Sequence, residues 1–319
     1  MRLVAIAEDR PGPKWRARFE ALWPRYRPWM SRAAFDRPLA ERRAALAAHM
    51  PELVPVYERL CDLAGDDPVA HALLTGWGPP PVVRGCAVAV SPETEPVLVR
   101  NYDFTSDFFE GTLHHGRWSG GPTVIASSEV LLGALDGIND AGLAAALTFG
   151  GRPVVGEGFG NPWLVRYVLE TCATVEEAIA ALVRIPSAMS TNIVVMDRTG
   201  AHAVAMLNPD REPVVTRAPV STNHQTTIDW PEGAARSQTL ERRDLLTRLR
   251  ETPGATREDL VAAFLAPPIL REDFTGVMGT FYTAVYRPAE GAVTFRWPDR
   301  PAWEQRLDRF EEGAREIPG

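Results

Sequence analysis

The stretch that decides the fold is Arg84-Gly85-Cys86-Ala87-Val88-Ala89-Val90, followed shortly by Val99-Arg100-Asn101-Tyr102-Asp103-Phe104. The cysteine opens an alternating apolar run that is typical of a strand, and residues 91–96 have turn chemistry. Val97 begins a second strand, so the two strands form a hairpin. Because the chain reverses at the turn, Arg100 and Asp103 return toward the level of Cys86. A thiol, a guanidinium and a carboxylate at the end of one hairpin predict a chemical site.

A plainer interpretation of the same residues stays open. Most free cysteines are small buried hydrophobic residues. Cys86 would then belong to the core, and Arg100 and Asp103 would form an ordinary ion pair.

Bulk composition excludes several classes of function. The chain has 319 residues, enough for one large or two small domains, and its net charge of -7 favours neither nucleic acid nor an anionic membrane as a partner. No apolar stretch reaches the length of a membrane span. Three cysteines fit a reducing compartment, so we expect a cytoplasmic protein. Cofactor and metal motifs are missing, so neither group is expected.

The N-terminal part predicts a separate helical segment. Residues 1–78 are rich in arginine and aromatic residues with helical spacing, and Pro79-Pro80-Pro81 follows as an extended arm. We place the functional boundary between Gly85 and Cys86. Residues 1–85 are thus a helical prosegment and residues 86–319 the catalytic domain. Alternatively, the prolines are a linker between two domains.

The remaining elements alternate between hairpins and helix pairs. Strands are predicted at 130–135 and 143–148, joined by a loop at 137–142, and the charged tail is predicted to be helical. Strands as apolar as 192–196 need cover on both faces. Two stacked sheets with helices outside satisfy that need.

These motifs resemble those of the N-terminal nucleophile (Ntn) hydrolases. Gly-Cys, a strand, a turn and Arg-Asn-Tyr-Asp-Phe are most similar to the isopenicillin-N acyltransferase-like peptidases, with choloylglycine hydrolases and acid ceramidase-like amidases as more distant relatives. The loop at 137–142 and Thr222-Asn223-His224 match two further family segments. The resemblance implies an α+β fold, the four-layer αββα sandwich, preceded here by the helical prosegment.

The resemblance also implies a role for each site residue. Cleavage between Gly85 and Cys86 would make Cys86 the N-terminal nucleophile. Asp103 would hold the new amine, and Arg100 would lie beside the thiol or meet a substrate carboxylate. Asn223, with Asn139, would donate to the oxyanion. Arg236 is the expected supporting arginine, with Arg242 as the alternative.

The residues permit two ways of activating the thiol. The α-amino group of a cleaved Cys86, with a reference pKa of about 8, can take the thiol proton at neutral pH. Alternatively, His224 is the base and Asn223 orients it, as in papain-like proteases. Papain-like cysteines begin a helix, whereas Cys86 begins a strand, and this difference favours the amine.

We therefore expect a self-processing enzyme whose partner is a small-molecule acyl amide. A thioester at Cys86 serves both hydrolysis and acyl transfer, and the sequence does not choose between them. The residues expected to bind an apolar acyl group are Tyr102, Phe104, Phe108 and Trp118. An inactive binding module is the alternative, because Ala87 and Leu240 replace the family's hydroxyl residue and arginine. The sequence leaves a homo-oligomer open.

Overall fold

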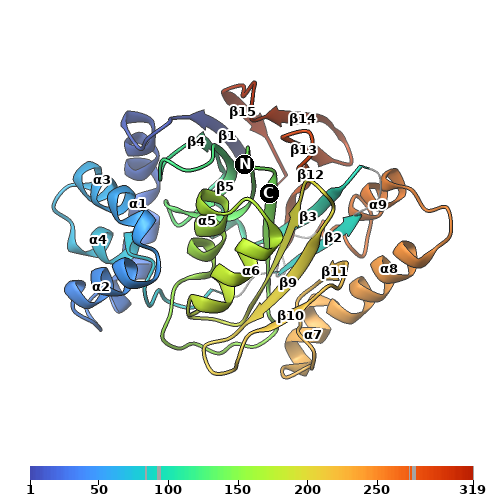
Figure 1. The fold of residues 1–319 in the computed structure, drawn as a ribbon, viewed down its shortest axis with the longest axis horizontal. Coiled ribbons are helices and arrows are strands. Elements are labelled where there is room, and N and C mark those ends of the chain that lie inside the picture. The colour runs from blue at the N-terminus through green and yellow to red at the C-terminus, as the bar shows by residue number, and fades with distance from the viewer. Residues whose placement is uncertain (83–84, 92–94, 273, 275–277, 319) are drawn as a thin grey trace.

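The computed structural model describes residues 1–82, 85–91, 95–272, 274 and 278–318. The last part of the predicted arm, at 83–84, and the tip of the predicted turn, at 92–94, lie outside these residues. Within them, the chain forms two stacked β-sheets with helices on both outer sides (Figure 1).

The larger sheet has nine strands in the described part of the chain, and β1 and β4 are parallel neighbours. In spatial order it contains β10 (Val214–Thr216), β9 (His202–Leu207), β8 (Thr191–Asp197), β7 (Leu143–Phe149), β6 (Gly133–Asn139), β5 (Val124–Glu129), β4 (Thr112–Gly116), β1 (Arg2–Ala7) and β15 (Gly313–Glu316). The smaller sheet contains β11 (Val220–Ser221), β2 (Gly85–Ser91), β3 (Val97–Phe104), β12 (Gly279–Arg287), β13 (Ala292–Trp297) and β14 (Arg300–Arg306).

Helices form the outer layers. Figure 1 shows α5 (Asn161–Thr171) and α6 (Val175–Arg184) over the larger sheet. On the other side lie α7 (Pro231–Ser237), α8 (Thr239–Glu251) and α9 (Arg257–Phe264). One end carries α1 (Pro13–Ala34), α2 (Leu39–His49), α3 (Val54–Ala64) and α4 (Pro68–Leu74). Short 3-10 turns occupy Pro51–Leu53 and Ser106–Phe108. The predicted αββα sandwich is confirmed.

Strand alternation decides which side chains of the β2–β3 hairpin face the centre of the sandwich. Ala87 and Val99 pack in a small cluster with residues of α8 and α9. Cys86 and Tyr102 belong instead to the main core. Because side chains alternate along a strand, Cys86 points toward the larger sheet.

The predicted prosegment contains a strand as well as helices. Helices α1 to α4 agree with the prediction, but residues 2–7 form β1, which lies between β4 and β15. The indole nitrogen of Trp15 donates to the carbonyl of Leu131, 2.9 Å away, and Tyr26 and Met30 are fully buried. Residues 1–82 therefore complete the larger sheet rather than forming an independent unit.

Other predicted elements were wrong in detail. The tail forms strands β14 and β15: in β14 the buried Trp303 and Gln305 alternate with charged residues, and β15 pairs with β1. The loop predicted at 137–142 begins too early, since β6 continues to Asn139. This strand position is a glycine because α5 packs closely against it: a Cβ atom on Gly137 would lie 2.7 Å from a methyl group of Leu169.

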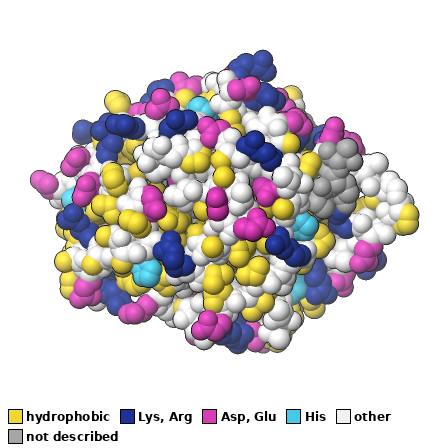
Figure 2. All heavy atoms as spheres, viewed as in Figure 1, with side chains coloured by type: hydrophobic (Ala, Val, Ile, Leu, Met, Phe, Trp, Pro, Cys, Tyr) yellow, Lys and Arg dark blue, Asp and Glu magenta, His cyan; other side chains and the backbone are white. Residues whose placement is uncertain are grey.

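The surface shown in Figure 2 intersperses basic and acidic side chains without a patch of one sign. No helix in the described ranges is both long and apolar enough to cross a bilayer.

Candidate active site

Cys86 lies at the start of β2, opposite Tyr102 of β3, and is fully buried. Val88, two residues on, lies opposite Arg100. Residues two apart on a strand share a face, so Cys86, Tyr102 and Arg100 all face the larger sheet. The hairpin thus brings the predicted thiol and guanidinium together.

The Arg100 guanidinium contacts the thiol directly. Its Nη2 donates to Cys86 Sγ at 3.2 Å, its Nε donates to the carbonyl of Leu147 at 3.3 Å, and its Nη1 pairs with Asp136. Burial alone lowers the pKa of Arg100, but Cys86 and the nearby tyrosines raise it, and the net shift is upward. A fixed buried cation beside the sulfur stabilises its thiolate form.

Asp136 orients Arg100, and the sequence did not identify it as a site residue. Its carboxylate also accepts hydrogen bonds from Tyr286 and, at 3.0 Å, from Tyr282. Burial raises the pKa of Tyr282 to about 12, so this hydroxyl remains a donor. A carboxylate within an otherwise apolar strand needs buried hydrogen-bond or ionic partners. The position of Asp136 in such a strand was therefore the sequence signal that could have identified it.

Asn223 follows β11 and reaches the predicted cleavage site. Its Oδ1 accepts a hydrogen bond from the backbone nitrogen of Cys86 at 3.2 Å. That contact fixes the amide orientation, since only the oxygen can accept. Its Nδ2 is buried and makes no hydrogen bond within the described residues. A buried amide donor without a partner next to a nucleophile suits an oxyanion.

The loop that carries Asn223 is held by two polar side chains of the larger sheet. Thr148 and Asn192 both donate to the carbonyl of Thr222, at 3.0 and 3.1 Å, and Asn192 also donates to the carbonyl of His224 at 3.0 Å. Both carbonyls flanking Asn223 are thus fixed to buried strands, so its side chain has a defined position.

Asp103 lies opposite Gly85, the residue before the predicted cut. Its carboxylate pairs with Arg242 at 2.6 Å and accepts from the hydroxyl of Thr280 at 2.7 Å. In this uncut chain the nitrogen of Cys86 donates to Asn223 instead. A Cβ atom on Gly85 would lie 3.1 Å from the sulfur of Met278 and 3.4 Å from the Cβ of Asp103, so a side chain here would require Met278 to shift slightly.

Arg242, the alternative, lies beside Asp103, whereas the expected Arg236 does not. Arg242 is fully buried against Asp103, whereas Arg236 is exposed and lies over the Trp230 ring at 5.1 Å. The reason is a helix break: Gln238 has a left-handed φ of 50° between α7 and α8. Arg236 in α7 and Arg242 in α8 therefore do not belong to one continuous helix.

Asn139 does not offer its amide to the site. Its Nδ2 donates to the carbonyls of Leu169 and Cys172 at 2.9 and 2.8 Å, and its Oδ1 accepts from the backbone of Leu143. Since the amide already has these partners, the side chain connects the β6–β7 turn to the end of α5.

The four predicted aromatic residues do not form one pocket. Tyr102 shares the face of Cys86 and donates to Glu129 at 2.9 Å, and Phe104 stacks on it. Phe108 is half-buried and lines a surface groove. The indole of Trp118 donates to the carbonyl of Glu8 at 3.0 Å, so this ring packs in the core.

His224 is not positioned as a base for Cys86. Its Nδ1 lies 2.9 Å from the Thr239 hydroxyl and its Nε2 lies 3.1 Å from the Arg243 guanidinium. Burial, helped by Arg243, lowers the pKa of His224 to about 4, so the ring is neutral at neutral pH with both nitrogens engaged. This geometry does not support the papain-like alternative.

The low pKa of His224 predicts a pH-dependent stability. A histidine of ordinary pKa near 6.5 in the unfolded chain binds a proton before His224 does in the folded protein. We expect the free energy of unfolding to fall as the pH drops from about 6.5 to about 4. Urea denaturation at several pH values should show this fall, with a shallower one in His224→Gln. Equal slopes for both proteins would contradict this assignment.

No group of metal-ligating side chains occurs among the residues that the structure describes.

Comparisons with known proteins agree with this architecture. Two variants of the conjugated bile acid hydrolase of Clostridium perfringens are similar structures: the first has a TM-score of 0.53 at 12% identity over 72% of this chain and 96% of its own. The second has a TM-score of 0.51 at 13% identity over 72% and 97%. Penicillin V acylase of Agrobacterium tumefaciens gives 0.48 at 16% identity over 70% and 86%. None of the curated proteins matches the chain.

The bile acid hydrolase structures show the shared sandwich fold. The sequence itself matches one family model over residues 90–302, about two thirds of its length. That match covers β3, with Arg100 and Asp103, and the segments that carry Asn223 and Arg242. The chain therefore belongs to the acyl-coenzyme A:6-aminopenicillanic acid acyl-transferase family of the Ntn hydrolases.

Proposed function

We propose that the protein is a self-processing cysteine amidohydrolase or acyltransferase that forms a thioester between Cys86 and the acyl group of a linear, non-peptide amide. One observation supports it most: Cys86 lies between the Arg100 guanidinium, 3.2 Å from its sulfur, and Asn223, whose buried amide has an unpaired Nδ2. Cation, nucleophile and oxyanion donor are the parts that acyl transfer needs.

The first reaction is cleavage of the chain itself. The Cys86 sulfur attacks the carbonyl carbon of Gly85, the S–C bond forms and the Gly85–Cys86 C–N bond breaks. The thiol proton ends on the nitrogen of Cys86, which becomes a free amine. Water then hydrolyses the thioester, which releases the Gly85 carboxylate and restores the thiol.

Turnover repeats the attack on an external amide. The free amine of Cys86 takes the thiol proton and passes it to the leaving amine. Asn223 Oδ1 accepts a hydrogen bond from the amine of Cys86, and Asn223 Nδ2 donates to the tetrahedral oxyanion. Asp103 lies opposite Gly85, the residue before the cut, and its carboxylate, paired with Arg242, holds the new N-terminus in place. Water completes hydrolysis and an acceptor amine completes transfer.

The inactive-module alternative loses one of its supports. Ala87 replaces the family's hydroxyl residue, but its side chain packs toward α8 and α9, on the opposite face from Cys86. The replacement therefore leaves the surroundings of the thiol unchanged. Labelling the cleaved protein with an acyl-amide mimic tests this choice directly, since an inactive module would leave Cys86 unmodified.

Incubation with a panel of N-acyl amino acids, penicillins, bile-salt conjugates and N-acyl amines tests the proposed reaction. We expect acid release from at least one class, and product formation with an added amine if transfer competes with water. A cleaved, folded protein that neither turns over nor labels would contradict the proposal.

After cleavage, the prosegment should remain bound. Strand β1 pairs with β4 on one side and β15 on the other, and α1 buries Trp15, Tyr26 and Met30. Removing it would open the sheet and expose this core. We expect one peak in native size exclusion that contains two masses under denaturing conditions. A folded chain of residues 86–319 that elutes alone would contradict this expectation.

A further inference from the structure

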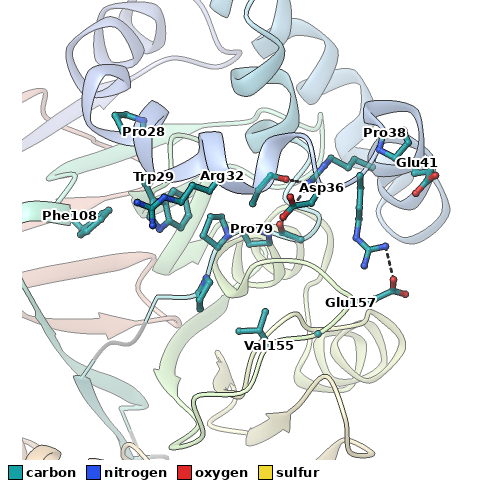
Figure 3. Close-up of a pocket in the computed structure, with 17 residues that line it drawn as sticks. Pro28, Trp29, Arg32, Asp36, Pro38, Glu41, Pro79, Phe108, Val155 and Glu157 are labelled. Carbon is teal, nitrogen blue, oxygen red and sulfur yellow. Dashed lines mark hydrogen bonds and ion pairs between the residues drawn. The ribbon is translucent and has the colours of Figure 1, made fainter.

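Two neighbouring hollows lie along the proline arm. An outer groove of about 1200 Å³ lies between α1, the arm at 79–81 and the loop at 155–157. Beside it lies an inner pocket of only about 30 Å³, and Trp29, Pro79 and Pro80 line both. Figure 3 shows Trp29 and Arg32 reaching from α1 toward Pro79, with Phe108 nearby.

The inner pocket lies close to the thiol. One of its walls is Leu147, whose carbonyl accepts a hydrogen bond from the same Arg100 that contacts Cys86. Another is Val82, four positions before Cys86, which limits the distance between them to about 14 Å along an extended chain. The pocket is otherwise mostly apolar, with Val130, Phe149 and Trp163 among its walls.

The arm shows which side of the site binds the acyl group. In the proposed cleavage, the first acyl group that Cys86 receives is the C-terminal end of this arm. An external amide must present its carbonyl to the same sulfur and the same Asn223 donor. Its acyl chain therefore extends from Cys86 in the direction of Val82, into the inner pocket. Pro79, Pro80 and Val82 of the uncut arm form part of its wall, and the space that remains is small.

Cleavage enlarges this space while the base of the arm stays fixed. The backbone nitrogen of Gly78 donates to the carbonyl of Gly158 at 2.9 Å, and that of Gly160 donates to the carbonyl of Gly76 at 2.9 Å. These bonds hold the chain before Pro79, whereas the Gly85 end is released from Cys86. Trp29 stays in place on α1, packed edge-to-face against Phe108.

We propose that Trp29 of the retained prosegment forms one wall of the acyl pocket in the mature enzyme and sets a preference for long, unbranched apolar acyl groups. The proposal rests on the proposed function for its chemistry, but the pocket can be tested by binding alone. In a narrow apolar pocket, the affinity for an acyl chain rises about fourfold for each methylene that is buried. An aromatic wall supplies part of that gain through direct contact.

The test is isothermal titration of the cleaved protein with straight-chain carboxylic acids from butyrate to palmitate, followed by kcat/KM for the corresponding N-acyl amides. We expect affinity to rise with chain length. Trp29→Ala should weaken palmitate about tenfold and change butyrate little, and Trp29→Phe should restore most of the loss. Trp23→Ala is the matched control, because this α1 indole bonds Asp67 at 3.0 Å and lines neither hollow.

The outcomes separate the two proposals. Affinity that is independent of chain length, or equal behaviour of the Trp29 and Trp23 variants, would overturn the acyl pocket. Turnover with a chain-length preference that Trp29→Ala leaves unchanged would overturn it as well. Trp29-dependent binding without hydrolysis or transfer of any amide would support the pocket and refute the proposed reaction.

Discussion

Cys86→Ala is expected to give a folded, uncut chain without amidase activity. The variant has no nucleophile at the position that Arg100 Nη2 and Asn223 Oδ1 both approach, so neither the chain nor an external amide can be attacked there. The side chain is buried in the main core, but losing one sulfur costs little volume. Cys86→Ser should still be cut slowly, because a hydroxyl can make the same acyl shift.

The matched controls are the other two cysteines. Burial raises the pKa of Cys61 to about 11 and also raises the pKa of Cys172, so both thiols are protonated at neutral pH. Cys61→Ala and Cys172→Ala should be cut and active like the wild type. Intact mass and an amide turnover assay provide both readouts. Normal cleavage in Cys86→Ala would show that another group performs the reaction.

Asn223→Ala is expected to slow cleavage and to lower kcat by about 10²–10³, with a smaller change in KM. The reason is that its buried Nδ2, which has no hydrogen-bond partner among the described residues, would gain one when the oxyanion forms. Asn223→Asp refines the test: it keeps an acceptor for the Cys86 nitrogen but places negative charge against the oxyanion, so it should be at least as slow. Single-turnover and steady-state kinetics measure these effects.

Asn208→Ala controls for the loss of an asparagine in general. This side chain bonds Gln225 at 2.8 Å and Arg152 at 3.0 Å, and none of its hydrogen bonds involves Cys86 or Asn223. Its kcat should match the wild type. If Asn223→Ala lowered kcat no more than this control, Asn223 would not be the oxyanion donor.

The site was predictable where it depends on one hairpin. Cys86 and Arg100 are brought together by two adjacent strands and a short turn, and strand alternation puts them on one face. Asn223 was assigned from the Thr-Asn-His segment of the family, and the structure places its amide at the Cys86 nitrogen. The first assignment needs only the local geometry of a hairpin, and the second needs only a short motif that resembles the family's.

Asp136 was missed because its role depends on partners from distant segments. Arg100 comes from β3 and the two tyrosines come from β12, and only the packing of the two sheets brings them together. Arg242 was only the alternative to Arg236 in the sequence analysis, because the helix break between them is not visible in the sequence. A left-handed residue at Gln238 is uncommon outside glycine and asparagine, so the break between α7 and α8 had no clear signal.

The strands at the two ends of the chain were the hardest to predict. Strand β1 is parallel to β4, more than a hundred residues away, and antiparallel to β15 at the other end of the chain. Strands β14 and β15 carry charged residues that also favour helices. Charged residues suit strands at the edge of a sheet, where they limit pairing with other chains. Such long-range pairing leaves little trace in local periodicity.

The most direct test of the account is the intact mass of freshly purified protein together with N-terminal sequencing. The account predicts two chains, residues 1–85 and 86–319, the second beginning with Cys86. A single uncut chain that still hydrolyses amides would contradict the amino-terminal mechanism and would require another base for the thiol.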